Sequence, residues 1–284
     1  MKIGINQIRL TAAVCALLGS SSSGALAADD VSRWDGDARS AVRLIAGSPP
    51  PRMVPFVRAG IQVRLKSGWH TYWRYPGDSG VPPQFDFSGS QNVKDVHVLW
   101  PAPERLSEAG AVSIGYAHDL TMPLHVIPHD LGKPVTLKMK LDYAICEKMC
   151  MPAVASAELT LATGPVSHDA ALVAAEALVP KMRALGEGEP FAVRSVRRET
   201  GPKGPRVVVD VAAPNGMSVT LFAEGPTPQW ALPVPEPVNG APDGIKRFAF
   251  DLDGAPPGAS YEGALVKLTA VGQEGGIEVA IRLD

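Results

Sequence analysis

The amino-acid sequence predicts an all-β protein with two β-sandwich domains joined by a short helical linker. Three observations favour this fold. Short stretches alternate between apolar and polar residues, glycine and proline recur between these stretches, and one segment has helical spacing instead. Alternation with a period of two, interrupted by turn residues roughly every 8–12 positions, is typical of antiparallel sandwiches.

The alternating stretches fall into two groups along the chain. The first group comprises residues 61–65, 96–100, 135–141 and 157–161. The second group comprises residues 191–196, 206–211, 217–222, 245–252, 264–271 and 277–283. We therefore expect one sandwich domain over residues 28–165 and a second over residues 190–284. The second domain contains neither cysteine nor histidine, which favours a binding or scaffolding module.

The segment between the two groups predicts a helix over residues 169–185, within a linker at 166–189. Its apolar residues recur at helical spacing, and Gly186 follows the last of them. Ser167 is a plausible N-cap. Pro180 is expected to bend or divide the helix, because proline cannot donate the intrahelical hydrogen bond.

The N-terminus has the features of a secretory signal peptide at residues 1–27. Lys2 and Arg9 supply the positive charge of the first segment, and residues 10–18 are a short apolar run. A small-x-small cleavage motif ends at Ala27. We therefore expect export to the periplasm. No later stretch approaches about 18 uninterrupted apolar residues, so no membrane insertion of the mature chain is expected.

The charge balance argues against nucleic acid as a partner. The formal net charge of the whole chain is −2. The predicted leader contains Lys2 and Arg9 but no acidic residue, so its removal makes the chain more acidic. An acidic protein is repelled by phosphate backbones, and we expect no nucleic-acid binding.

The most informative feature is one pair of cysteines. The chain has three cysteines, and Cys15 would leave with the leader. Cys146 and Cys150 remain, in a compartment where disulfides persist. The sequence predicts a strand that ends at Cys146, followed by a turn. Pro152 is expected to end regular strand pairing, and a second strand is expected to begin at Ala155. Both sulfurs would then lie at the neck of a hairpin, where Cα atoms about 4.5–5.5 Å apart permit a disulfide.

The spacing of this pair leaves a redox, a structural and a metal-binding role open. A disulfide that closes about five residues contributes roughly 2 kcal/mol by loop entropy, against roughly 4.7 kcal/mol for a 100-residue loop. This is weak stabilisation, whereas a disulfide at a loop tip is accessible to an attacking thiolate. Between the cysteines, Lys148 would favour a thiolate and Glu147 would oppose it.

The metal-binding alternative depends on four soft sulfur donors. This composition suits Cu(I), which is the one cofactor that the sequence suggests. The donors are Cys146, Met149, Cys150 and Met151. The methionines would equally serve as apolar contacts for a partner protein. A third alternative is an interaction module with an inert disulfide.

Three stretches resemble, in the same order, the N-terminal periplasmic domain of the thiol:disulfide interchange protein DsbD and its copper-sensitivity-suppressor, ScsB-like, relatives. Residues 68–80 resemble the aromatic strand and turn beside that family's site. Residues 106–123, centred on Gly115 and Tyr116, resemble the segment that carries its cap loop. Residues 143–152 resemble its cysteine hairpin, and the whole resemblance covers about residues 45–165.

The resemblance implies an immunoglobulin-like fold, which we expect for both sandwiches, and a pair of cysteines that alternates between dithiol and disulfide. It implies that Cys146 and Cys150 carry electrons and that Cys150 attacks partners. By position, Tyr72 and Tyr116 would flank or shield the sulfurs. Two features differ from the family's best-known member. That member has more than three residues between its cysteines. It also has an acidic pair before the aromatic residue of its cap, whereas here Glu108 lies several residues before Tyr116.

The resemblance also implies the partners. Family members take electrons from a membrane-embedded or thioredoxin-like domain and pass them to periplasmic oxidoreductases, including disulfide isomerases and cytochrome c maturation factors. In this chain a second β-domain follows instead, as in the ScsB-like relatives. We therefore expect a separate membrane electron donor, thioredoxin-like or isomerase partners, and a link to either cytochrome c biogenesis or copper tolerance.

Overall fold

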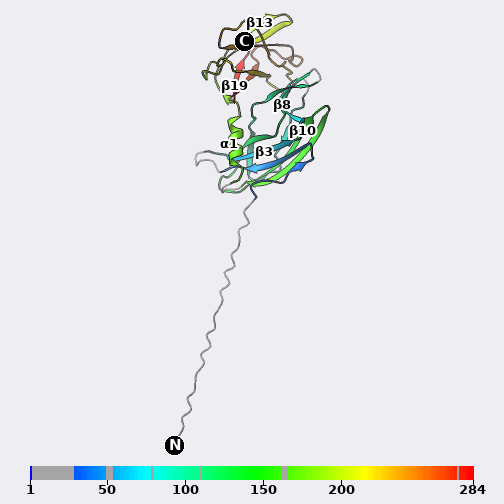
Figure 1. Ribbon diagram of the computed structural model, residues 1–284, viewed down its shortest axis with the longest axis vertical. Helices are drawn as coiled ribbons and strands as arrows, with labels where there is room; N and C mark the ends of the chain where they lie inside the picture. The colour runs from blue at the N-terminus through cyan, green and yellow to red at the C-terminus, as the bar shows by residue number, and fades with distance from the viewer. Residues whose placement is uncertain (2–28, 49–53, 78–79, 109–110, 162–165, 274) are drawn as a thin grey trace.

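The computed structural model describes Met1 and residues 29–284, apart from residues 49–53, 78–79, 109–110, 162–165 and 274. Apart from Met1, the predicted signal peptide lies outside the described residues. Four sheets form two β-sandwiches with one helix, α1, between them in the chain (Figure 1). The all-β, immunoglobulin-like fold class expected from the alternating sequence pattern is confirmed.

The first sandwich packs a five-stranded sheet against a six-stranded sheet. The five-stranded sheet has the order β1 (Asp35–Gly36), β2 (Ser40–Ala46), β3 (Val57–Leu65), β9 (Leu120–Pro128), β6 (Val93–Val98). The other sheet has the order β11 (Cys150–Leu161), β10 (Val135–Cys146), β4 (His70–Gly77), β8 (Ala111–Tyr116), β7 (Glu104–Glu108), with β5 (Gln84–Asp86) also paired to β10. Their inner faces share a core that includes Leu44, Ile61, Leu124, Leu137 and Leu141, all at most 1% exposed.

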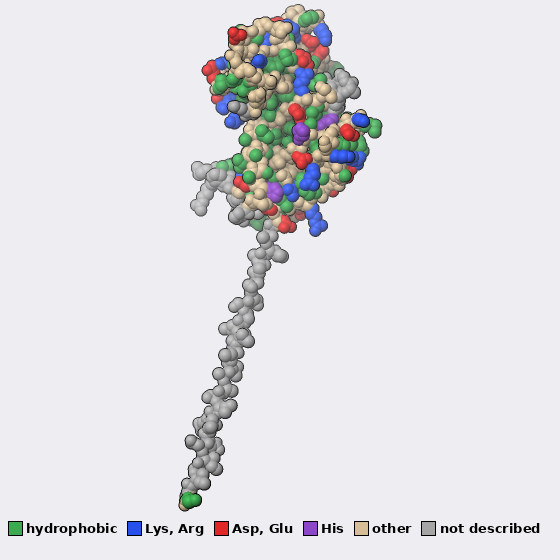
Figure 2. All heavy atoms as spheres, viewed as in Figure 1, with side chains coloured by type: hydrophobic (Ala, Val, Ile, Leu, Met, Phe, Trp, Pro, Cys, Tyr) green, Lys and Arg blue, Asp and Glu red, His purple; other side chains and the backbone are tan. Residues whose placement is uncertain are grey.

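The second sandwich consists of two four-stranded sheets. One has the order β12 (Lys181–Met182), β19 (Gly275–Arg282), β18 (Leu265–Gly272), β15 (Thr220–Glu224). The other has the order β13 (Ala192–Gly201), β14 (Gly204–Ala212), β17 (Ile245–Asp251), β16 (Glu236–Pro237). On the face shown in Figure 2, acidic and basic side chains are interspersed over both domains. No helix among the described residues is long and apolar enough to cross a bilayer.

The helix is shorter than the sequence pattern predicts. Helix α1 covers Asp169–Ala177 and ends before Pro180, because the proline cannot continue the helical hydrogen bonds. Directly after Pro180, β12 pairs in parallel with β19, so the second sandwich begins inside the segment predicted as helix. The prediction that Ser167 caps the helix is wrong. Its hydroxyl donates to Asp30 at 2.6 Å, and the N-cap residue is His168.

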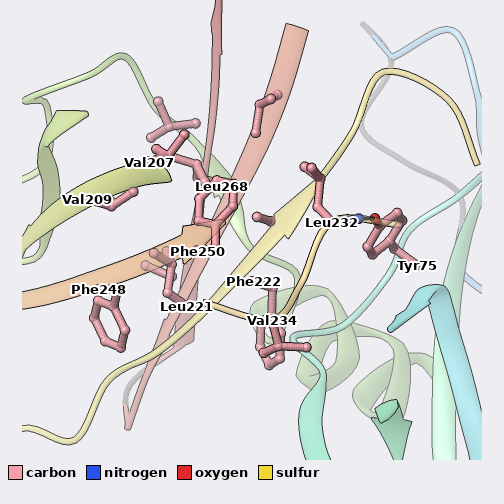
Figure 3. Close-up of a cluster of buried hydrophobic side chains, with 14 of the residues drawn as sticks. Tyr75, Val207, Val209, Leu221, Phe222, Leu232, Val234, Phe248, Phe250 and Leu268 are labelled. Carbon is pink, nitrogen blue, oxygen red and sulfur yellow. Dashed lines mark hydrogen bonds between the residues drawn. The ribbon is translucent and has the colours of Figure 1, made fainter. Parts of the chain in front are cut away.

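The two sandwiches share part of one hydrophobic core. Trp73 and Tyr75 of β4, with Ile114 and Tyr116 of β8, belong to the same buried cluster as the interior of the second sandwich. Figure 3 shows Tyr75 reaching from the first domain toward Leu232 of the second. The middle of β4 is therefore buried against the second domain.

Candidate functional site

The β10–β11 hairpin places the two cysteines opposite each other at its end. Its register runs without interruption from Val135 paired with Leu161 to Cys146 paired with Cys150. The Cα atoms of the two cysteines are 4.1 Å apart and their sulfurs form a disulfide. Three exposed residues, 147–149, form the turn between them. The predicted hairpin with both sulfurs at its neck is therefore present.

The prediction that Pro152 ends the pairing is wrong. Pro152 lies within β11, opposite Ala144, and the strand begins at Cys150 rather than at Ala155. β11 is the edge strand of its sheet, and among the described residues its ladder partner is β10 alone. A proline is tolerated on such an edge strand, because its missing N–H removes no hydrogen bond from a neighbouring strand.

Tyr72 covers the disulfide from the neighbouring strand. β4 runs antiparallel to β10, with His70 opposite Cys146, and strand alternation brings Tyr72 onto the same face. The Tyr72 hydroxyl lies 2.8 Å from Cys146 Sγ and 3.2 Å from Cys150 Sγ. Tyr72 is 1% exposed and forms a small buried cluster with Ala144 and Cys146. A phenol hydroxyl in this position can donate a hydrogen bond to either sulfur.

Neighbouring groups hold this part of β4 in place. The Thr71 hydroxyl donates to the carbonyl oxygen of Ala144 at 2.9 Å. The His70 ring packs edge-on against Tyr72, with centroids 5.6 Å apart. The backbone of Gly80 lies against the same ring, since a Cβ there would be 2.7 Å from Tyr72 Cδ1. The sequence pattern did not single out these contacts, because none of the three residue types is specific to a redox site.

The two cysteines differ in exposure. Cys146 is 1% exposed, whereas Cys150 is exposed at the start of the edge strand. Cys146 is buried in a small cluster with Tyr72 and Ala144. An incoming thiolate must approach the sulfur it attacks. Cys150 is therefore the more accessible of the two cysteines.

The structure does not bring Tyr116 to the sulfurs. Tyr116 pairs with Thr71, and the residue opposite Tyr72 is Gly115. A difference of one position reverses the face in a strand, so the Tyr116 side chain points away from the disulfide. Its hydroxyl donates to the carbonyl oxygen of Pro101 at 2.8 Å, and burial raises the pKa of this phenol. Tyr116 belongs to the interdomain core instead.

Gly115 is needed because the backbone of Thr71 passes directly over it. A Cβ at Gly115 would overlap the Thr71 carbonyl oxygen. We expect Gly115→Ala to lower the free energy of unfolding by about 1–3 kcal/mol, as other overpacking substitutions do. Urea denaturation of the oxidised protein measures this loss. Gly89→Ala is a matched control, because its Cβ would be in ordinary contact, 3.5 Å from Lys138. Equal stability of the two variants would contradict the steric explanation.

Glu147 and Lys148, the residues considered as modulators of the thiol pKa, lie in the exposed turn between the cysteines. Solvent and salt screen charges in such a position. The Glu147 carboxylate reaches toward the Gly68 backbone, where a Cβ would be 3.6 Å from its Oε1. The Tyr72 hydroxyl, by contrast, lies within hydrogen-bond distance of both sulfurs.

The four sulfur donors considered for Cu(I) are not gathered on one side of the hairpin. Met149 is 76% exposed in the turn. Met151 follows Cys150 and so lies on the opposite face, where its Sδ accepts a hydrogen bond from Arg39 at 3.2 Å. In the disulfide form, Cys146 and Cys150 are bonded to each other rather than available as thiolates. Within the described part of the chain, no group of three or more histidine, cysteine or acidic residues could hold a metal ion.

Comparisons with known proteins agree with this fold. Residues 56–162 match the family model described as "Thiol:disulfide interchange protein DsbD, N-terminal". The crystal structure of the N-terminal periplasmic domain of ScsB from Proteus mirabilis is similar, with a TM-score of 0.68 and 20% sequence identity. The similarity covers 90% of this chain and 98% of that chain, and so includes most of both sandwiches. No curated protein matches the sequence. The resemblance to the DsbD N-terminal domain and its ScsB-like relatives is therefore confirmed.

Proposed function

We propose that this chain, whose residues 56–162 match the DsbD N-terminal family, is a periplasmic carrier that exchanges thiols and disulfides through Cys146 and Cys150. One observation carries the proposal. The hairpin presents an exposed Cys150 bonded to a Cys146 that is buried beneath a tyrosine hydroxyl. One sulfur is thus accessible to a partner, and the other is placed to act as leaving group and resolving thiol.

The exchange needs no group beyond the two partners. A partner thiolate attacks Cys150 Sγ, the Cys146–Cys150 bond breaks, and Cys146 leaves as a thiolate. The partner's second thiolate then attacks the partner sulfur that is bonded to Cys150. This forms the partner's disulfide and releases Cys150 as a thiolate. Two electrons pass from the partner dithiol to this protein. In the reverse direction Cys150 attacks the disulfide of an acceptor and Cys146 resolves the mixed disulfide.

Tyr72 favours the departure of Cys146. The hydroxyl lies 2.8 Å from Cys146 Sγ, and a hydrogen bond to a charged acceptor is stronger than one to a neutral acceptor. The bond therefore strengthens when the sulfur becomes a thiolate. This stabilises the reduced state relative to the disulfide, which makes the disulfide easier to reduce.

The proposed partners are proteins with thioredoxin-like folds, including disulfide isomerases, together with a separate membrane electron donor. The exposed turn with Met149 provides an apolar, adaptable contact beside Cys150, which suits docking to more than one partner. Export through the predicted leader would place the carrier in the compartment where such partners act.

The reduction potential of the disulfide tests this proposal. We expect a value above about −300 mV, in the range of exchange-active disulfides rather than of structural ones. The full chain without its leader is equilibrated with defined ratios of reduced and oxidised thiol buffers, and the free thiols are counted by alkylation. A Cys146→Ser/Cys150→Ser variant controls for alkylation elsewhere. A potential well below about −300 mV would instead assign a structural role to the disulfide.

A further inference from the structure

We propose that the second sandwich contributes to the redox site by holding β4 in the position that keeps Tyr72 against the two sulfurs. Tyr75 and Arg74 are the positioning residues. This inference rests on the proposed exchange function and gives the second domain a role in it.

β4 has few ladder partners in its own sheet beyond Tyr72. It pairs with β10 only at His70 and Thr71, since β5 occupies the edge of β10 at residues 140–142. Its pairing with β8 includes Thr71 and Tyr72, becomes irregular, and resumes at Gly77. Residues 73–76 therefore lie in a break in the register of the first sandwich. Over residues 73–76 the ladder to β8 is disrupted, so this stretch receives less support from its own sheet.

The second sandwich contacts β4 within this break. Tyr75 receives a hydrogen bond from the backbone N–H of Leu232 at 2.6 Å (Figure 3). It also donates to the carbonyl oxygen of Trp230. The Trp73 ring packs against Phe222, with centroids 5.9 Å apart. Both aromatic side chains are buried, at 8% and 0% exposure respectively.

Arg74 adds charged contacts between the same stretch of β4 and the second domain. Its guanidinium donates to both carboxylate oxygens of Glu224, at 2.9 and 2.6 Å, and also to Glu278. A displacement of this stretch would move the adjacent Tyr72 with it. Residues 73–75 are thus held by the second domain, while Tyr72 lies against the disulfide of the first.

The hydrogen bond from Tyr72 makes this support consequential. Hydrogen bonds weaken steeply with distance and angle, so a small displacement of β4 would weaken the bond to Cys146. Tyr75→Phe removes both hydrogen bonds to the second domain but keeps the ring in the core. The equilibrium constant for reduction of the disulfide should therefore respond to Tyr75 through Tyr72.

A double-mutant cycle in the full chain tests the inference. The reduction equilibrium is measured against dithiothreitol, which reduces structural disulfides as well, for wild type, Tyr72→Phe, Tyr75→Phe and the double variant. We expect Tyr72→Phe to lower the equilibrium constant about fivefold, the effect of one net hydrogen bond. Tyr75→Phe should lower it about two- to threefold by weakening the same bond. In the Tyr72→Phe background, Tyr75→Phe should change nothing further.

Tyr261→Phe is the matched control. The Tyr261 hydroxyl accepts a hydrogen bond from the N–H of Ala255 at 3.0 Å, entirely inside the second domain. Its loss should leave the reduction equilibrium unchanged. An unchanged equilibrium in Tyr75→Phe, or effects that multiply in the double variant, would overturn the positioning role. A very low reduction potential of the wild-type disulfide would count against the exchange function but not against the positioning role. The double-mutant cycle can still be measured in that case.

Discussion

Replacing Arg74 with methionine is expected to lower the free energy of unfolding by about 3–5 kcal/mol, the usual cost of removing one partner from a buried ion pair. The Arg74 side chain is 23% exposed, and those of Glu224 and Glu278 are 9% and 10% exposed. Burial alone would lower the pKa of Arg74, but the two carboxylates outweigh burial and raise it. Without the guanidinium, two carboxylates would remain buried beside each other. Urea denaturation at neutral pH measures the loss.

Two further variants separate this cause from a general loss of contact between the domains. Arg105 also crosses the interface, to Glu236 at 2.7 Å, but the Glu236 side chain is 62% exposed. Arg105→Met should therefore cost no more than about 1 kcal/mol. Adding Glu224→Gln and Glu278→Gln to Arg74→Met should restore part of the stability, because neutral amides replace the unpaired charges. A triple variant less stable than Arg74→Met would contradict the electrostatic explanation.

The fold was predictable wherever a strand is long and has one buried face. The predicted stretch at residues 206–211 lies within β14, and residues 245–252 correspond closely to β17. In both strands successive valines or phenylalanines face the core. β12 and β16, with two residues each, carry no periodic pattern and form only because a neighbouring strand offers hydrogen bonds. Such elements depend on tertiary context and leave no signal in the sequence.

The site was predictable to the level of residue type but not of strand register. The spacing of Cys146 and Cys150 was sufficient to place both sulfurs at a hairpin neck. From the resemblance we expected both Tyr72 and Tyr116 to flank or shield them, whereas the observed register puts Gly115 opposite Tyr72 and the Tyr116 side chain on the other face. A sequence motif shows which residues lie in neighbouring strands. It does not show which of two adjacent residues faces the site.

The link between the domains could not be predicted at all. Arg74 lies 150 residues from Glu224 and 204 from Glu278. An arginine in an aromatic strand and two glutamates in alternating strands are each typical of exposed positions. Only the packing of the two sandwiches shows that these charges are buried together. The second domain, expected from its composition to be a scaffold, therefore contacts the strand that carries Tyr72.

The difference in exposure between the cysteines predicts which single-cysteine variant forms a mixed disulfide. With Cys146→Ala, the exposed Cys150 remains and should react rapidly with the aromatic disulfide 5,5′-dithiobis(2-nitrobenzoate). With Cys150→Ala, the remaining Cys146 is 1% exposed beneath Tyr72 and should react at least about tenfold more slowly, because the attacking thiolate needs access to the disulfide. The release of the coloured thiol measures both rates.

A third variant shows whether the tyrosine is the barrier. Adding Tyr72→Ala to Cys150→Ala removes the side chain that covers Cys146, and should raise the rate of Cys146 toward that of Cys150. The same variants, expressed with the leader in a bacterial host and quenched with acid, should give mixed disulfides with thioredoxin-like proteins mainly through Cys150. Equal rates for the two single-cysteine variants would show that burial does not set the order of attack. The buried sulfur would then be open to partners, and the division between an attacking Cys150 and a resolving Cys146 would be lost.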